Sequence, residues 1–145
     1  MRSLEQGSPD AVLHGRTVVG GRAEGLALVT YQSVPGWGGI DPMSGIIIEK
    51  RHELFGVSVK DRVLVFPGAK GSSGWSAAFH TARLAGCAPS ALLFNRVDTK
   101  VALGAVVMRA PAITEFDVDP LSIIRTGDWI VVDGNNSIVE IYRTL

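Results

Sequence analysis

The chain has 145 residues, of which 46% are hydrophobic and 19% charged, a length and composition typical of one domain with one sizeable core. Fourteen basic residues balance fourteen acidic ones without any block of like charge, which argues against nucleic acid or an anionic membrane as the main partner. The single cysteine excludes a disulfide, a zinc site or an iron–sulfur cluster built by this chain, because each needs several ligands.

The first segment, residues 1–13, is expected to be a flexible tail before one domain that spans residues 14–145. It contains Glu5 and Asp10 and no continuous apolar stretch that would serve as a signal peptide, so the expected compartment is the cytoplasm. Apolar runs elsewhere, such as residues 63–66, are far shorter than the ~18 residues that a spanning helix needs. We therefore expect no membrane segment.

Short apolar runs, rich in β-branched residues and separated by glycines, predict a series of strands. They are expected at residues 16–19, 26–31, 45–49, 62–66, 91–94, 129–133 and 137–142. The last two flank Gly134, Asn135 and Asn136, which tolerate positive φ and predict a terminal hairpin. The predicted fold class is α/β, with a strand-rich sheet or barrel-like core and one or two helices.

One helix is well marked by its sequence. It is expected at residues 74–85, with Ser72 or Ser73 as its N-cap, several alanines inside, and Gly86 and Pro89 just after its end. A second helix is expected at residues 99–107, although the valines there fit a strand nearly as well.

A glycine-rich loop, Trp37-Gly38-Gly39-Ile40-Asp41-Pro42, separates two of the expected strands. Adjacent glycines let the backbone approach a ligand or another chain closely, and Asp41 before Pro42 is able to hold a turn through its own carboxylate. Two interpretations stay open for this loop: a tight structural turn, or the edge of a binding cleft.

The most informative stretch is Pro67-Gly68-Ala69-Lys70-Gly71-Ser72-Ser73-Gly74-Trp75-Ser76, which leaves a strand and enters the first helix. Such a loop gathers free backbone N–H groups at the positive end of the helix dipole, where an anion is stabilised. It does not match a phosphate-binding Walker A loop, because Lys70 is followed by Gly71. The same N–H groups would stabilise the alkoxide of a serine acting as a base, whereas the structural alternative for Ser72 and Ser73 is helix capping.

Other reactive side chains show no pattern of their own. His14, His52 and His80 lack metal-ligand spacing, and we expect each to be a surface or half-buried side chain. Cys87 is expected to be a small buried side chain just past the first helix. The sequence leaves the functions of His52, His80 and Asp98 open.

Several groups of residues together resemble the small, swivelling-domain subunit of the aconitase X family, over roughly residues 15–142. These groups are Trp37-Gly38-Gly39-Ile40-Asp41-Pro42 with Gly45, then His52 and Gly56, then Pro67-Gly68-Ala69-Lys70-Gly71-Ser72-Ser73, then Ala88-Pro89. The resemblance implies a β/β/α swivelling domain, like the mobile last domain of aconitases, that closes over a large subunit holding an iron–sulfur cluster. It also implies dehydration chemistry, on cis-3-hydroxy-L-proline in bacteria and on mevalonate 5-phosphate in archaea.

The resemblance also implies roles for residues of the Gly/Ser stretch. In aconitases a Gly-Ser-Ser-Arg loop supplies a serine that abstracts the substrate proton, and Ser72 matches that serine, which makes Ser73 a cap or an oxyanion-side partner. Gly74 stands where aconitases have arginine, so a guanidinium for the substrate carboxylate is expected from the large subunit. Lys70 replaces an arginine frequent in the family and keeps only its charge. The other expected substrate-binding or supporting residues are Gly71, Gly38, Gly39 and Asp41.

The working hypothesis is a small subunit of a two-chain hydro-lyase that converts cis-3-hydroxy-L-proline to a pyrroline carboxylate, with Ser72 as base. No metal or cofactor is expected on this chain, because the iron–sulfur cluster would belong to the large subunit. One alternative is a mevalonate 5-phosphate dehydratase subunit, which predicts basic residues at the site beyond Lys70. Another is a noncatalytic swivelling module that binds an anion and has no partner enzyme.

Overall fold

The computed structural model describes residues 7–143. Its strands are β1 (Ala11–His14), β2 (Arg16–Val19), β3 (Arg22–Val29), β4 (Val34–Pro35), β5 (Ile40–Asp41), β6 (Ile46–Ile47), β7 (Val63–Phe66), β8 (Ala69–Lys70), β9 (Ala91–Phe94), β10 (Ala112–Thr114), β11 (Trp129–Asp133) and β12 (Ile138–Tyr142). Its helices are α1 (Trp75–Leu84), α2 (Thr99–Met108) and α3 (Pro120–Ile123). Within residues 7–143, no helix is long and apolar enough to cross a bilayer.

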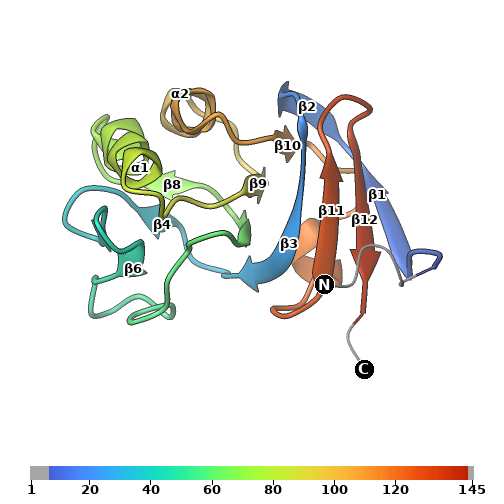
Figure 1. The fold of residues 1–145 in the computed structure, drawn as a ribbon, viewed down its shortest axis with the longest axis horizontal. Coiled ribbons are helices and arrows are strands. Elements are labelled where there is room, and N and C mark those ends of the chain that lie inside the picture. The colour runs from blue at the N-terminus through green and yellow to red at the C-terminus, as the bar shows by residue number, and fades with distance from the viewer. Residues whose placement is uncertain (1–6, 144–145) are drawn as a thin grey trace.

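Eight of the strands form one sheet, in the order β1-β12-β11-β3-β7-β9-β10-β2. Strands β3, β7, β9 and β10 are parallel to one another, and the other neighbours are antiparallel. Although β1 and β2 lie at opposite ends of this order, only Gly15 separates them in the chain. The sheet therefore curls until its two edges approach, which gives the strand-rich body at the right of Figure 1 and confirms the expected α/β class.

Alternating side chains of the parallel strands contribute to two hydrophobic cores. In β7, Val63 and Val65 belong to the core inside the curled sheet, whereas Leu64 and Phe66 belong to the core beneath the helices. β9 divides its side chains in the same way. Because both faces of these strands are covered, their sequences are continuous apolar runs rather than alternating apolar and polar residues.

Helices α1 and α2 lie on the outer side of the sheet, together with the two-stranded pairs β4–β8 and β5–β6 (Figure 1). The carboxylate of Asp98 caps α2 by accepting a hydrogen bond of 2.9 Å from a backbone N–H of its first turn. Helix α1 has Gly74 at its N-cap and no side-chain cap, so the capping alternative for Ser72 and Ser73 is not found. This leaves the amino end of α1 open to solvent or to a ligand.

The predicted helices are both confirmed, and α2 is a helix rather than the alternative strand. The predicted strands are confirmed at residues 16–19, 91–94 and in the terminal hairpin, and to within a residue at 62–66. The strand expected at residues 26–31 begins earlier and ends earlier, as β3. The strand expected at 45–49 is shortened to the two residues of β6, because the chain turns away after Ile47.

The start of the chain differs from the expected flexible tail. Strand β1 begins at Ala11 and pairs antiparallel with β12, so regular structure starts three residues before the expected domain boundary at residue 14. A four-residue strand at a sheet edge gains its stability from its neighbour, which a local sequence pattern does not reveal. The earlier part of the expected tail, residues 1–6, lies outside the described residues.

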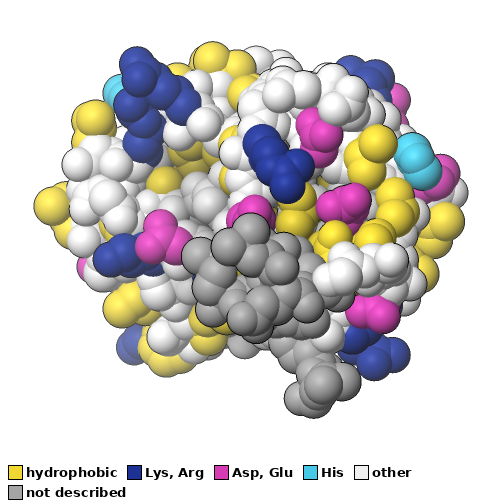
Figure 2. All heavy atoms as spheres, turned by 45° about the vertical axis from the view of Figure 1, so that its right-hand side comes forward, with side chains coloured by type: hydrophobic (Ala, Val, Ile, Leu, Met, Phe, Trp, Pro, Cys, Tyr) yellow, Lys and Arg dark blue, Asp and Glu magenta, His cyan; other side chains and the backbone are white. Residues whose placement is uncertain are grey.

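The surface carries both signs of charge. On the face shown in Figure 2, basic and acidic side chains lie in small separate groups between apolar ones. This arrangement agrees with the balanced composition, fourteen basic against fourteen acidic residues. The face shown therefore has no extended field of one sign that would steer a polyanion.

Candidate active site

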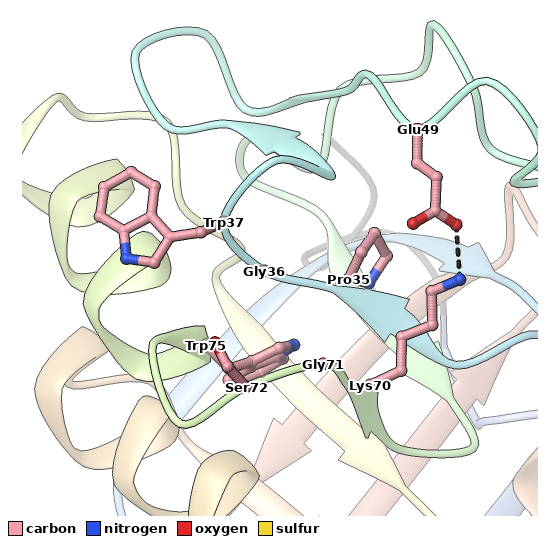
Figure 3. A pocket seen from close by; sticks show the side chains of 8 residues that line it. All are labelled: Pro35, Gly36, Trp37, Glu49, Lys70, Gly71, Ser72 and Trp75. Carbon is pink, nitrogen blue, oxygen red and sulfur yellow. Dashed lines mark hydrogen bonds and ion pairs between the residues drawn. The ribbon is translucent and has the colours of Figure 1, made fainter.

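The Gly/Ser loop, residues 71–74, connects β8 to α1 and forms one wall of a pocket of about 150 Å³. β8 pairs in parallel with β4, and this pairing places the chain after β4 beside the loop. The pocket is lined by Pro35, Gly36, Trp37, Glu49, Lys70, Gly71, Ser72 and Trp75 (Figure 3). Of the expected site residues, the structure thus brings Lys70, Gly71 and Ser72 together at one pocket.

Trp75, the first residue of α1, anchors the site. Its side chain is 1% exposed, and its indole N–H donates a hydrogen bond of 2.9 Å to the carbonyl of Val34 in β4. Two glycines allow this packing: a Cβ at Gly36 would lie 2.8 Å from the Trp75 Cα, and one at Gly104 would lie 2.3 Å from the Trp75 ring. The loop therefore enters α1 over a rigid floor to which β4 and α2 both contribute.

The Ser72 side chain is exposed and lines the pocket. Its Oγ accepts a hydrogen bond of 3.3 Å from the Gly74 N–H, and its carbonyl accepts one of 3.2 Å from the Trp75 N–H. Among the described residues, the N–H groups of Ser72 and Ser73 have no hydrogen-bond acceptor. The hydroxyl is thus held by a backbone donor at the amino end of a helix, where negative charge on oxygen is stabilised.

Two lysines contact this region. The Lys70 ammonium lies 2.5 Å from a carboxylate oxygen of Glu49, which bridges the mouth of the pocket (Figure 3). The Lys100 ammonium reaches in from α2 and donates a hydrogen bond of 3.0 Å to the carbonyl of Gly71. One ion pair and one charge-assisted hydrogen bond therefore join the Gly/Ser loop to two other parts of the chain.

The remaining expected site residues lie outside the pocket lining. The Asp41 carboxylate accepts hydrogen bonds from the Ser44 hydroxyl at 2.8 Å and from the Met43 N–H, and the first of these is the larger cause of its lowered pKa. The Gly39 carbonyl accepts hydrogen bonds from the N–H groups of Ile48 and Glu49, which follow β6. Gly38 is exposed with φ 81°, a conformation that favours glycine. In the structure these residues shape the turn, and Trp37 is the member of this loop that lines the pocket.

The sequence profile of the aconitase X swivel domain matches residues 12–141. The chain belongs to this family. The match includes both glycine-rich loops and the whole curled sheet except the first residue of β1 and the last of β12.

Named relatives of this aconitase X swivel domain agree with the assignment. The phosphomevalonate dehydratase small subunit of Methanocella arvoryzae is 38% identical over 129 residues, which is 89% of this chain and 98% of the relative. The protein of the same name from Archaeoglobus fulgidus is 39% identical over 126 residues, 87% of this chain and 95% of the relative. The crystal structure of Thermococcus kodakaraensis aconitase X in its holo form superposes with a TM-score of 0.85 at 33% identity, over 92% of this chain and 99% of that one.

Two of the other reactive side chains of the swivel domain, His52 and Asp98, make hydrogen bonds that hold the fold. His52 is buried, and its Nδ1 accepts from the Leu54 N–H at 3.0 Å, so its Nε2 carries the proton and donates to the Ser33 carbonyl at 3.1 Å. His80 is exposed on α1, and Asp98 caps α2. The imidazole of His52 thus ties two loops together through both of its ring nitrogens.

The donor set of the described residues does not fit an iron–sulfur cluster. The Cys87 thiol is buried, donates a hydrogen bond of 3.2 Å to the Pro42 carbonyl, and has a pKa raised chiefly by burial. No group of three His, Cys, Asp or Glu side chains within residues 7–143 is placed to bind a metal. A cluster needs several exposed thiolates, and this part of the chain does not provide them.

Sequence reasoning missed Glu49 and Lys100. Glu49 closes the pocket only because the turn after β6 brings it back toward β8, and nothing local marks it. Lys100 did carry a signal: it is the second residue of α2, where the helix dipole disfavours a cation. The Asp98 carboxylate, 4.0 Å away, compensates this charge in part, and the Gly71 carbonyl is its other partner.

Proposed function

We propose that this chain is the small subunit of a two-chain dehydratase that removes water from a phosphorylated hydroxy acid of the mevalonate 5-phosphate type. The observation that carries the proposal is the Ser72 hydroxyl, which lines a pocket at the open amino end of α1 beside two lysines. The names of the relatives from Methanocella and Archaeoglobus point to the same reaction class.

The names of the relatives favour a phosphorylated substrate over cis-3-hydroxy-L-proline, whereas Lys70, the cation in the pocket lining, is paired there with Glu49. A phosphorylated hydroxy acid carries more negative charge than the cyclic amino acid, so its site needs more than one cation. The Gly/Ser loop itself contributes only Lys70, but α2 brings the Lys100 ammonium to the Gly71 carbonyl. Lys100 thus adds a second positive charge beside the loop, with its ammonium on the loop backbone rather than in the pocket lining.

In the proposed reaction, Ser72 takes a proton from the carbon next to the substrate carboxylate. The electron pair of that C–H bond forms a carbon–carbon double bond, and the hydroxyl on the next carbon leaves. The Gly74 N–H, at 3.3 Å from the Ser72 Oγ, would stabilise the alkoxide form that acts as base. An iron–sulfur cluster in the large subunit would supply a Lewis acid for the leaving hydroxyl.

The size of the pocket supports a two-chain site. Small-molecule sites usually enclose ~300–1,000 Å³, whereas the pocket beside Ser72 holds about 150 Å³ and leaves the serine exposed. Trp37, half of whose surface is exposed at the rim, would lie against a covering chain. We therefore propose that the large subunit closes the other side of the site.

The test is a co-expression assay under anaerobic conditions. The chain, alone and with a candidate large iron–sulfur subunit, is given mevalonate 5-phosphate or cis-3-hydroxy-L-proline, and alkene or pyrroline formation is measured. We expect turnover of the phosphorylated substrate by the complex alone. We expect Ser72→Ala to lower kcat by about 10²–10⁴-fold, because a positioned base contributes that much, while the control Ser8→Ala, at an exposed serine outside the pocket lining, retains most activity.

Other outcomes would assign another function. Turnover of cis-3-hydroxy-L-proline alone would keep the reaction class and replace the substrate. A Ser72→Ala complex that assembles and turns over at the normal rate would remove Ser72 as the base. Failure of the two chains to associate, with carboxylate or phosphate binding by this chain alone, would indicate a noncatalytic anion-binding module.

A further inference from the structure

Lys100 occupies an electrostatically unfavourable position. It is the second residue of α2, and the unpaired N–H groups at a helix amino end repel a cation. Its side chain is 28% exposed, and its ammonium lies 4.0 Å from the Asp98 carboxylate that caps the same helix. Asp98 therefore compensates the charge in part from within the helix, and the shorter contact of Lys100 is the one with the Gly/Ser loop, at 3.0 Å.

Helix α2 presents Lys100 from a rigid support. One turn further along, Gly104 lets α2 lie directly on the Trp75 ring, because any Cβ at that position would be 2.3 Å from the Trp75 Cζ3. The Asp98 cap fixes the first turn of the same helix. Lys100 thus extends to the loop from α2, which is itself packed on Trp75, the residue that follows the loop.

The loop needs a contact of this kind. Gly71 has φ 99°, a conformation that glycine adopts freely, and no atom lies within 4 Å of the place where its Cβ would be. The hydrogen bonds inside the loop are long, at 3.3 Å to the Ser72 Oγ and 3.2 Å to the Ser72 carbonyl. The 3.0 Å bond from the Lys100 ammonium to the Gly71 carbonyl is shorter, is charge-assisted and comes from another element.

We infer that Lys100 is a positioning residue for Ser72. Its ammonium holds the Gly71 carbonyl, which belongs to the same peptide group as the Ser72 N–H, and so keeps the Ser72 hydroxyl in its place at the pocket. The inference rests on the proposed function in one respect, that Ser72 is the base. Lys100 itself touches the loop backbone rather than substrate.

The first measurement does not depend on catalysis. Amide hydrogen exchange of the hydrogen-bonded loop amides, those of Gly74 and Trp75, is compared in the full chain for the wild type, Lys100→Met, Lys100→Arg and the control Lys60→Met, which removes an exposed lysine outside the pocket lining. We expect several-fold faster exchange of the loop amides in Lys100→Met and wild-type exchange in the other two, because opening of an untethered loop costs less free energy. Unchanged exchange in Lys100→Met would overturn the tether.

The second measurement separates positioning from folding. Since Lys100→Met removes an unfavourable charge from a helix amino end, its unfolding temperature should stay equal to that of the wild type or rise. In the complex with the large subunit, kcat should fall by about 100-fold, the effect of misplacing a reacting group by ~1 Å, with a smaller change in KM. Lys100→Arg should recover most of the kcat.

The remaining outcomes would reject either the positioning role of Lys100 or the role of Ser72 as base. A raised KM with normal kcat in Lys100→Met would mean that the lysine binds substrate, and a fall in unfolding temperature that matches the loss of activity would mean a folding role. Faster loop exchange in Lys100→Met together with a fully active Ser72→Ala complex would keep the tether and reject Ser72 as the base. The two proposals can therefore fail separately.

Discussion

At the scale of single residues, one carboxylate shows how the fold holds its loops. Glu53 accepts hydrogen bonds from the Thr30 hydroxyl at 2.5 Å and from the Tyr31 N–H at 2.6 Å, at the point where β3 ends. These donors, the Thr30 hydroxyl first, keep the pKa of Glu53 below its ordinary 4.5. Together with His52, Glu53 binds the segment after β6 to the region where β3 ends.

This lowered pKa predicts how stability depends on pH. A carboxyl group whose pKa is lower in the folded chain stabilises the fold above its unfolded pKa, and this contribution disappears as the pH falls through the folded value. Glu53→Gln should therefore lower the free energy of unfolding at pH 7, and the gap from the wild type should narrow below pH 4. Urea unfolding of the wild type and Glu53→Gln at pH 7 and at pH 3 measures this difference in the free energy of unfolding.

The control for this experiment is Asp61→Asn. The Asp61 side chain is exposed and makes no hydrogen bond to the described residues, so its replacement should have little effect at either pH. An equal gap between the wild type and Glu53→Gln at pH 7 and at pH 3 would show that the ionised carboxylate contributes nothing to stability.

At the scale of elements, α1 and α2 depend on each other through one close contact. Trp75 packs with its ring 4.4 Å from that of Phe79 and also contacts α2 at Gly104. The glycine costs α2 some intrinsic stability, because glycine is ~1 kcal/mol less favourable than alanine inside a helix. The glycine allows α2 to lie against the Trp75 ring, where a Cβ would be 2.3 Å from the nearest ring atom.

Gly104→Ala tests this contact. Although alanine favours the helix, its methyl group would overlap the Trp75 ring, so we expect a net loss of about 1–3 kcal/mol in the free energy of unfolding. Leu103→Ala is the control on the neighbouring residue, which is 48% exposed, and should change stability by no more than ~0.5 kcal/mol. Chemical denaturation followed by tryptophan fluorescence measures both, and a stabilised Gly104→Ala would mean that α2 is free to shift away from Trp75.

At the scale of the whole molecule, the fold has two hydrophobic cores, and only one of them lies beneath the pocket. The curled sheet holds one complete core, while the second core, beneath α1 and α2, supports the pocket. Closure of the sheet depends on the one-residue connection between β1 and β2, where a Cβ at Gly15 would lie 2.6 Å from the Ile113 side chain and 2.7 Å from the Thr114 carbonyl. A side chain at this connection would push the two edges of the sheet apart.

Gly15→Ala should therefore destabilise the whole chain. We expect a loss of about 1–3 kcal/mol in the free energy of unfolding, because one of the two close neighbours is backbone and cannot rotate away. Gly20→Ala is the matched control, since its Cβ would meet the end of the Asn135 side chain at 3.1 Å and the Gly134 carbonyl at an ordinary contact distance of 4.0 Å. Equal stability of the two variants in thermal unfolding would show that the connection has room to adjust.

Local signals in the sequence were sufficient for the regular elements and for part of the site. The apolar runs of β7, β9 and β11, the alanine-rich helix and the Asn-containing hairpin depend on neighbours in the chain, and so does the strand–loop–helix order that points to Lys70, Gly71 and Ser72. The strands of two residues, β4, β5, β6 and β8, are too short to show a period, so their positions were missed or misjudged.

Only the tertiary structure decided what surrounds Ser72. The sequence by itself determined the α/β fold class, the aconitase X resemblance and a serine at the amino end of a helix. Glu49, Trp37 and Lys100 join that serine because β4 pairs with β8 and because α2 packs on Trp75, contacts between residues that are far apart in the chain. The same contacts leave Gly38, Gly39 and Asp41 outside the pocket lining. Long-range packing selects such neighbours by shape and charge, which no local pattern encodes.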